Sequence, residues 1–172
     1  DGNPDFEKLQ KMLPDLPLFV PGHGDDTGDG TNHAGRCLEA LVRFYEATGD
    51  DRTLDVADRI ARYHRARTVR DDGAMPEHIV DEANIGHNHS YNGTLRGLLL
   101  WGLLTGQRDY VDAVSATFDG AVTTHCVTPS GYAPHDLGRR RFDNDHGEPV
   151  GEDASCGDAI QRALWLGLRC GR

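Results

Sequence analysis

Apolar residues recur at helical spacing along most of the chain beyond residue 34. Leu41 and Val42 follow Leu38 by three and four positions, a spacing that predicts a helix with one buried face. The Thr-Gly-Asp sequence at 48–50 ends this run, and glycine is the residue that most often closes a helix. A second, amphipathic helix is expected to follow the turn, with its charged residues facing water.

The same helix-turn-helix unit is present twice and begins a third time. Residues 38–58 align without gaps on residues 95–115, at an offset of 57 residues, with identical residues at helix-facing leucines, in the turn and at the start of the second helix. A third copy begins at Ala159, and Cys170-Gly171-Arg172 then takes the position of the turn. Repeats of this length, made of helix, tight turn, helix and long loop, are typical of helical-hairpin arrays.

The two helices of a hairpin differ in polarity, and the difference favours a two-layer, all-α architecture. The first helix of the second copy is apolar nearly all round from Leu98 to Leu104, which indicates burial on most faces. We therefore predict an (α/α)6 toroid type, with inner helices surrounded by outer ones; an open solenoid of the same hairpins is the alternative. Residues 1–32 are expected to form a short helix and a Gly/Asp-rich loop, and residues 33–172 about two and a half hairpins of an incomplete barrel.

Charge and hydropathy limit the partners of the chain. The net charge of −10 over 172 residues argues against nucleic acid or an anionic membrane as a partner, because both bind basic surfaces. No apolar stretch approaches the roughly 20 residues that span a bilayer. Both ends of the chain look cut, and an incomplete toroid would expose apolar helix faces. We expect the chain to be a segment of a larger protein or to associate with a partner, as in a homo-oligomer.

The four cysteines indicate the redox state of the compartment in which the protein is expected. Cys37, Cys126, Cys156 and Cys170 show no CxxC or other tight spacing, and two of them fall in apolar helical patterns. Free thiols in a reducing compartment are favoured over disulfide bonds. A cytoplasmic location is therefore expected, with a secreted or periplasmic one as the alternative.

Polar residues recur where the first helix of each copy begins. In a hairpin array all first helices run in the same direction, so their N-termini meet on one rim. The copies carry Thr-Asn-His at 31–33, His-Asn-His-Ser at 87–90 and Glu-Asp-Ala-Ser at 152–155. Short polar side chains cap helix N-termini. We assign that role to Asn32, Ser90 and either Asp153 or Ser155. Histidine is a poor cap, so the histidines indicate a cleft.

The composition of this rim and its loops suits a hydroxyl-rich ligand such as a sugar. Carboxylates accept hydrogen bonds from hydroxyls, and aromatic rings stack on the apolar faces of sugars. Glycoside cleavage also needs two groups that flank the scissile bond, and Glu152 and Asp153 are the candidates. The side chains expected to bind substrate are His33, His87, His89, Tyr91, Asn92, His135 and Asp136.

Cys156 follows Glu152 by one helical turn, so both side chains share one face of the helix. A thiol beside a carboxylate can act as a nucleophile or as a metal ligand. Equally, it can be a small buried residue, which is the commoner fate of a helical cysteine. Both interpretations stay open on spacing alone.

Three segments together resemble a known family. LEALVRFYEATGDDRTLDVADRIARY, GHNHSYNGTLRGLLLWGLLTGQRDYVDAV and GEDASCGDAI, within residues 33–170, resemble the six-hairpin glycosidase superfamily, and most closely the bacterial β-L-arabinofuranosidases and their uncharacterised relatives. The resemblance implies an (α/α)6 barrel with a sugar site at the rim. It also implies an acid/base role for Glu152 and a zinc-ligating thiolate at Cys156, although three residues separate them where the family has one.

Three other functions are compatible with the same residues. A polysaccharide lyase on this fold would use His89 as base and Tyr91 as acid. A noncatalytic helical-repeat module would bind carbohydrate or protein, and its rim histidines would be structural. A metal-dependent hydrolase would use His87 and His89 as ligands in the loop before the helix.

Overall fold

The computed structural model describes residues 35–80, 86–137, 151 and 153–171, and this part of the chain is all-α, as predicted. The predicted N-terminal unit, residues 1–32, lies outside the described residues. In chain order the elements are α3 (Cys37–Thr48), α4 (Asp51–Arg67), α5 (Glu77–Val80), α6 (Asn88–Thr105), α7 (Arg108–Thr117), the π-helical segment η1 (Phe118–Cys126) and α8 (Asp153–Cys170).

Glycines in the left-handed conformation end the first helix of each repeat, which confirms the three predicted turns. Gly49, Gly106 and Gly171 have φ angles of 68°, 71° and 70°. Residues with a Cβ are strained there, and glycine is not. The backbone N–H of Gly49 donates to the carbonyl of Tyr45 at 2.8 Å, and that of Gly171 donates to Gly167 at 3.2 Å. The turns at Gly49 and Gly171 therefore each satisfy a carbonyl that the helix end leaves open.

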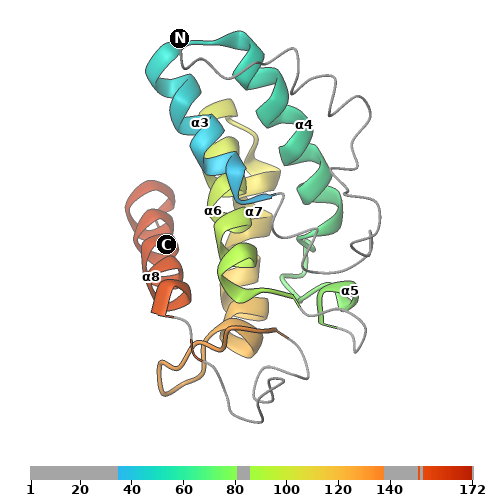
Figure 1. Cartoon of the computed structure of the whole chain (residues 1–172), viewed down its shortest axis with the longest axis vertical. Coiled ribbons are helices and arrows are strands. Elements are labelled where there is room, and N and C mark those ends of the chain that lie inside the picture. The colour runs from blue at the N-terminus through green and yellow to red at the C-terminus, as the bar shows by residue number, and fades with distance from the viewer. Residues whose placement is uncertain (1–34, 81–85, 138–150, 152, 172) are drawn as a thin grey trace.

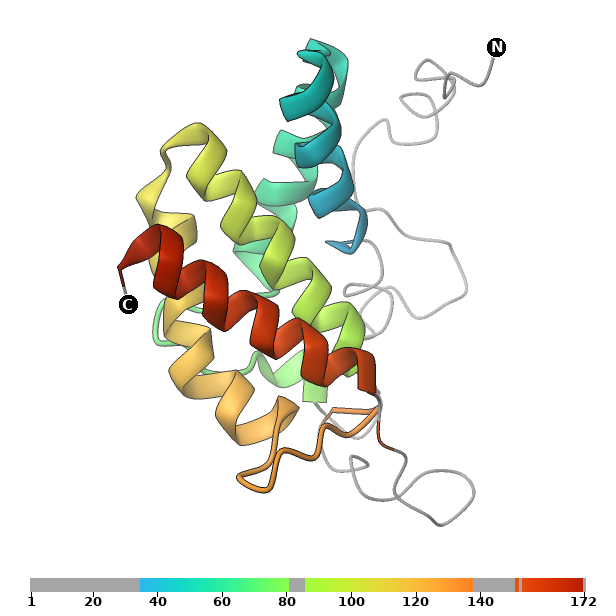
Figure 2. The ribbon, with the colours of Figure 1, turned by 90° about the vertical axis from the view of Figure 1, so that its left-hand side faces the viewer.

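Helix α6 is the centre of the described structure and contacts α3, α4, α7 and α8 (Figure 1). Nearly every residue from Asn88 to Gly102 is buried, including the polar ones in its first two turns. Figure 2 shows α8 crossing one face of α6. The burial on all sides that the apolar sequence predicts is thus confirmed.

Glycine on α6 allows its close approach to α3. A Cβ added at Gly97 would lie 2.7 Å from the Cβ of Leu38 and 3.0 Å from the backbone nitrogen of Glu39. Such distances are too short for carbon and nitrogen atoms that are not bonded. The two first helices can therefore cross this tightly only because α6 carries no side chain at that position.

Helix α4 has the amphipathic character expected of the second helix of a hairpin. Its buried side carries Ala57, Ile60 and Ala61. Its outer side carries charged residues that pair one turn apart, with Arg59 Nη2 2.8 Å from Asp55 Oδ2. Exposed pairs of this kind contribute only about 0.3–0.5 kcal/mol each, so the apolar side dominates the stability of the helix in this position.

The second hairpin contains more helix than predicted. The π-helical segment η1 continues α7 as far as Cys126, so the long loop expected after the second helix begins only beyond that residue. The hydroxyls of Thr123 and Thr124 donate to carbonyls one turn earlier, at 2.8 Å each. The buried residues Ala121 and Val122 of η1 extend the apolar side of α7. Because glycine and threonine form helices poorly, the local sequence of η1 does not predict a helix.

None of the four cysteines forms a disulfide bond, which agrees with the prediction of thiols. Cys126 is fully buried at the end of η1, and burial raises the pKa of its thiol to about 12. A thiol in that setting stays protonated at neutral pH and is a poor nucleophile. Among the described helices, none combines the length and the apolar character needed to cross a bilayer.

Candidate functional site

Two segments that are distant in sequence are tied together at the start of α6. His87 forms an isolated antiparallel bridge with Asp136. The backbone N–H of Asn88 donates to the carbonyl of His135 at 2.9 Å. The loop that follows η1 is therefore fixed against the entrance of α6, and the predicted site residues on the two segments become neighbours.

The side chain of Asn88 adds a second anchor below this bridge. Its Nδ2 donates to the carbonyls of Cys126 at 2.8 Å and Pro134 at 2.7 Å. The residue has no exposed surface, so these bonds form away from competing water. Asn88 thus holds both ends of the segment between η1 and the bridge, and it was not predicted to have this role.

Gly86, directly before the bridge, is required by a close contact. A Cβ at this position would lie 2.5 Å from the carbonyl oxygen of Ile79, in the short helix α5. The Gly-His pair that precedes α6 therefore has a structural reason: the glycine lets the backbone pass α5, and His87 follows at the helix entrance.

Three of the predicted histidines meet at this end of α6. The ring centroid of His87 lies 4.5 Å from that of His135 and 6.0 Å from that of His89. Nδ1 of His135 lies 2.6 Å from Oδ1 of Asp136. We refer to His87, His89, His135, Asp136 and Asp158, which pairs with His89, as the histidine rim.

Asp158 connects the rim to the third repeat. Its Oδ2 lies 2.5 Å from Nδ1 of His89, and its Oδ1 forms an ion pair with Nη1 of Arg96. Arg96 in turn reaches Glu39, with Nε 2.9 Å from Oε2. One continuous network of polar contacts therefore joins α3, α6 and α8. Only 6% of the Asp158 side chain is exposed, so its charge depends on these partners rather than on water.

Sequence reasoning missed Asp158 and Arg96. One signal was available: each is an ionisable residue within an otherwise apolar helical segment, where an unpaired charge is costly. Such residues are expected to pair with one another. The pattern could not show which helices would bring them together, because that depends on how α6 and α8 cross.

The helix cap at this end differs from the prediction. Ser90 was predicted to cap α6 and that was wrong: the cap position belongs to His87, which has extended backbone angles of −89° and 119° and makes no side-chain cap bond. Ser90 lies inside the first turn, with its Oγ 2.7 Å from Nδ1 of His87. The bridged loop supplies a backbone carbonyl to the N-terminus of the helix, so a short polar cap is unnecessary.

Tyr91 and Asn92, two predicted substrate-binding residues, lie in the interior. Neither has exposed surface, so neither faces a surface cleft among the described residues. Burial raises the pKa of the Tyr91 hydroxyl above its ordinary value. No hydrogen-bond partner for that hydroxyl is found in the described structure. A phenol in this state is a poor general acid for a lyase reaction.

Arg162 of α8 lies in the same interior region and was not predicted at all. It has no exposed surface, and its three side-chain nitrogens lack hydrogen-bond partners among the described residues. Its guanidinium carbon lies 5.5 Å from the centre of the Phe118 ring. Burial lowers the pKa of Arg162. Burial of a cation is costly unless an acceptor compensates it, and the described residues supply none to Arg162.

Only some of the predicted catalytic, substrate-binding and metal-ligating residues lie in the part of the chain that the structure describes. Glu152 and His33 lie outside the described residues. Asp153 is exposed in the first turn of α8, and the thiol of Cys156 donates to the carbonyl of Gly131 at 3.3 Å. Within the described ranges no three His, Cys, Asp or Glu side chains are grouped as metal ligands. The described residues thus supply no zinc ligands beside Cys156, and we derive no chemical step from that metal.

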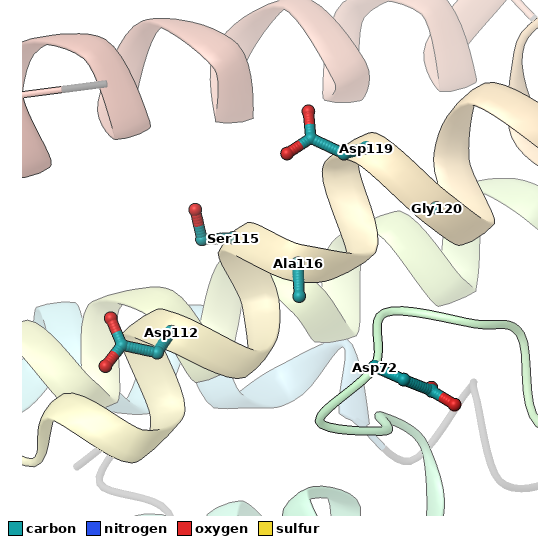
Figure 3. A pocket seen from close by; sticks show the side chains of 6 residues that line it. All are labelled: Asp72, Asp112, Ser115, Ala116, Asp119 and Gly120. Carbon is teal, nitrogen blue, oxygen red and sulfur yellow. The ribbon is translucent and has the colours of Figure 1, made fainter.

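A separate acidic depression of about 480 Å³ lies along α7 and the start of η1 (Figure 3). None of the rim residues borders it; its lining residues are Asp72, Asp112, Ser115, Ala116, Asp119 and Gly120. A hydrogen bond from Arg70 lowers the pKa of the exposed Asp72 carboxyl to about 2, so that carboxylate already has a cationic partner. The depression is a solvated acidic surface.

Comparison of the chain with protein-family models, with curated proteins and with solved structures found no match. The likeness to the six-hairpin glycosidases thus rests on the sequence segments that suggested it. Function has to be argued from the chemistry of the rim.

Proposed function

We propose that this chain belongs to a carbohydrate-active enzyme of the glycoside hydrolase type, which binds its substrate at the histidine rim. The observation that carries the proposal is that His87 and His89, at the start of α6, meet His135 of the loop that follows η1. Such a meeting is not needed to pack the helices, because the apolar core lies deeper.

The rim has the chemistry that a sugar requires. Imidazole nitrogens donate or accept according to tautomer, and carboxylate oxygens accept from hydroxyls. The side chain of His135 is 46% exposed and that of His89 23% exposed, so both reach solvent while still supported by packing. The faces of the three rings also offer apolar surface for the C–H side of a sugar.

For catalysis we propose Glu152 as general acid or base and Asp153 as its partner. What supports this assignment is position: α8 begins at Asp153 and packs against α6, whose N-terminus carries the rim. Two carboxyl groups that flank the scissile bond are the usual requirement for glycoside hydrolysis. The two-layer toroid is part of the same proposal, and α4 and α7, packed as outer helices against α6, support it.

One contact favours a second candidate, a polysaccharide lyase. In the neutral tautomer of His89 that donates from Nδ1 to Asp158 Oδ2, Nε2 carries a lone pair. A histidine oriented in this way by a carboxylate can act as a general base. The acid would have to be a residue other than Tyr91, since that hydroxyl is buried.

The test is a turnover screen of the protein on aryl glycosides and on uronate-containing oligosaccharides. Wild type and Glu152→Ala are compared with Asp109→Ala, which removes an exposed carboxylate at the start of α7 and serves as the control. We expect hydrolysis of at least one aryl glycoside, reduced about 100-fold or more by Glu152→Ala and unaffected by the control. An unsaturated product would assign the lyase reaction instead. Binding without turnover in wild type would assign a noncatalytic module and contradict the proposal.

A further inference from the structure

The carboxylate of Asp158 on α8 is divided between two partners on α6. Its Oδ2 lies 2.5 Å from Nδ1 of His89, and its Oδ1 forms an ion pair with Nη1 of Arg96. His89 and Arg96 are about two helical turns apart, so Asp158 bridges two turns of α6 from the neighbouring helix. Each of its oxygens therefore has its own partner.

Arg96 is held from a second direction by α3. Its Nε lies 2.9 Å from Oε2 of Glu39, while its Nη1 faces Asp158. A guanidinium is planar and its N–H groups point in fixed directions, so two carboxylates on two of its nitrogens fix its orientation. The position of the Asp158 carboxylate is therefore set by how α3 and α8 pack on α6.

A second cation lies near Asp158 without binding it. Arg162 follows Asp158 by one turn of α8, and the two charges interact. The side-chain nitrogens of Arg162 nevertheless have no hydrogen-bond partner among the described residues. The carboxylate thus turns toward α6 rather than along its own helix, and Arg96 is the cation that holds it there.

This arrangement determines which nitrogen of His89 carries the proton. An ion-paired carboxylate only accepts hydrogen bonds, so the ring nitrogen that faces it has to donate. A neutral imidazole has a single N–H, which leaves the lone pair on Nε2. Within the described part of the chain Asp158 is the only hydrogen-bond partner of the His89 ring, and 23% of the side chain is exposed. Nε2 is therefore available to a ligand.

We propose that Arg96 is a positioning residue of the histidine rim. By holding Oδ1 of Asp158 it commits Oδ2 to His89, and neutral His89 then offers Nε2 to the ligand as an acceptor. An acceptor at this point favours a ligand group that donates, such as a sugar hydroxyl, and disfavours an anionic oxygen. This consequence for the ligand rests on the function proposed for the rim, whereas the tautomer of His89 does not.

Nitrogen magnetic resonance of the ligand-free, 172-residue protein tests the proposal. The ring signals of His89 are identified by their absence from His89→Gln, and the pH is raised until they stop changing, so that the neutral ring is observed. Wild type is expected to favour Nδ1–H over Nε2–H by about tenfold or more, because hydrogen bonds to an ionised carboxylate are among the strong ones. A wild-type ring in the Nε2–H tautomer would overturn the proposal.

Substitutions of Arg96 test its part in this preference. Arg96→Met is expected to lose most of it, because Asp158 is then able to turn toward Arg162 or to take up a proton. Arg96→Lys supplies a cation to Oδ1 without the contact to Glu39 and is expected to retain the preference. Arg108→Met removes an exposed arginine that pairs with an aspartate of α7, and this matched control should leave His89 unchanged.

Circular dichroism verifies that each variant is folded. Asp158→Asn has nearly the same shape as wild type and is the second variant if Arg96→Met does not fold. Its amide is able to donate to Nδ1, so the preference is expected to disappear there as well. An unchanged tautomer in Arg96→Met or Asp158→Asn would overturn the proposal, as would a loss in Arg96→Lys equal to that in Arg96→Met. Turnover plays no part in these measurements, so they are independent of whether the proposed enzymatic function holds.

Discussion

Helices α6 and α8 are first helices of successive hairpins and both are 18 residues long, yet they are buried in opposite ways. Helix α6 is surrounded and buries apolar residues on every side. Helix α8 turns polar residues inward and leaves Ile160, Leu164 and Leu168 outside. The difference teaches that a repeat determines where a helix begins and ends, while its neighbours determine which of its side chains stabilise the fold.

The largest expected effect is on stability, and it contrasts one leucine from each helix. Leu98 of α6 has no exposed surface, whereas Leu168 of α8 is 83% exposed. Leu98→Ala is expected to lower the free energy of unfolding by about 3 kcal/mol, through lost burial and the cavity left behind. Leu168→Ala, the matched control, should change it by less than about 0.5 kcal/mol under monomeric conditions.

Urea denaturation of both variants at low protein concentration provides the measurement. Similar losses from the two substitutions would mean that Leu168 is covered within the monomer. The contrast between the two helices would then be wrong.

Substitution of Arg162 is expected to increase the free energy of unfolding instead. Arg162→Met replaces a buried guanidinium, which has no hydrogen-bond partner among the described residues, by an apolar side chain of similar length. The inner side of α8 then resembles that of α6. We expect an increase in unfolding free energy of about 1–3 kcal/mol, because the desolvation cost of the charge disappears. Arg59→Met on α4, where an exposed aspartate pairs with the arginine, serves as the comparison and should be nearly neutral. Destabilisation by Arg162→Met would show that the guanidinium has an acceptor in solution.

A further expected effect is a pH dependence of stability that arises in α4. Burial lowers the pKa of His64 to about 3, against an ordinary value of 6.5, and Nδ1 contacts the Thr68 hydroxyl at 2.7 Å. Between pH 6.5 and 3 the unfolded chain takes up a proton there that the folded chain does not. Stability is therefore complete above pH 6.5 and falls on acidification, by up to about 1.4 kcal/mol per pH unit.

Thermal melts from pH 7.5 to 4.5 measure this slope in wild type and in His64→Gln. The variant should be less stable at neutral pH but should lose less stability on acidification. Equal slopes for the two proteins would place the titration elsewhere.

The sequence was sufficient for the local features. Spacing of leucines and the glycines at 49, 106 and 171 predicted the helices and turns, because both depend on residues a few positions apart. It was insufficient where the outcome depends on distant helices. Asp158 and Arg162 lie one turn apart on α8. Residues of α6 pair with Asp158, whereas no acceptor for Arg162 lies in the part of the chain that the structure describes.

The same reasoning applies to the site. The repeat predicted that His87 and His89 would lie at a rim, and the long loop supplied His135 without indicating where it would lie. Its position follows from the bridge between His87 and Asp136, a backbone contact that side-chain patterns do not encode. Tyr91 was predicted to bind substrate, but helical rotation turns its side chain into the core.

The central claim is that the histidine rim binds sugar, and nuclear magnetic resonance of the imidazole nitrogens tests it most directly. Arabino-oligosaccharides and uronate-containing oligosaccharides are titrated into the labelled protein, and all histidines are followed together. We expect the signals of His87, His89 and His135 to shift with one common saturation curve, while buried His64 stays unchanged. Unmoved rim signals with every oligosaccharide, or shifts confined to histidines outside the rim, would contradict the claim.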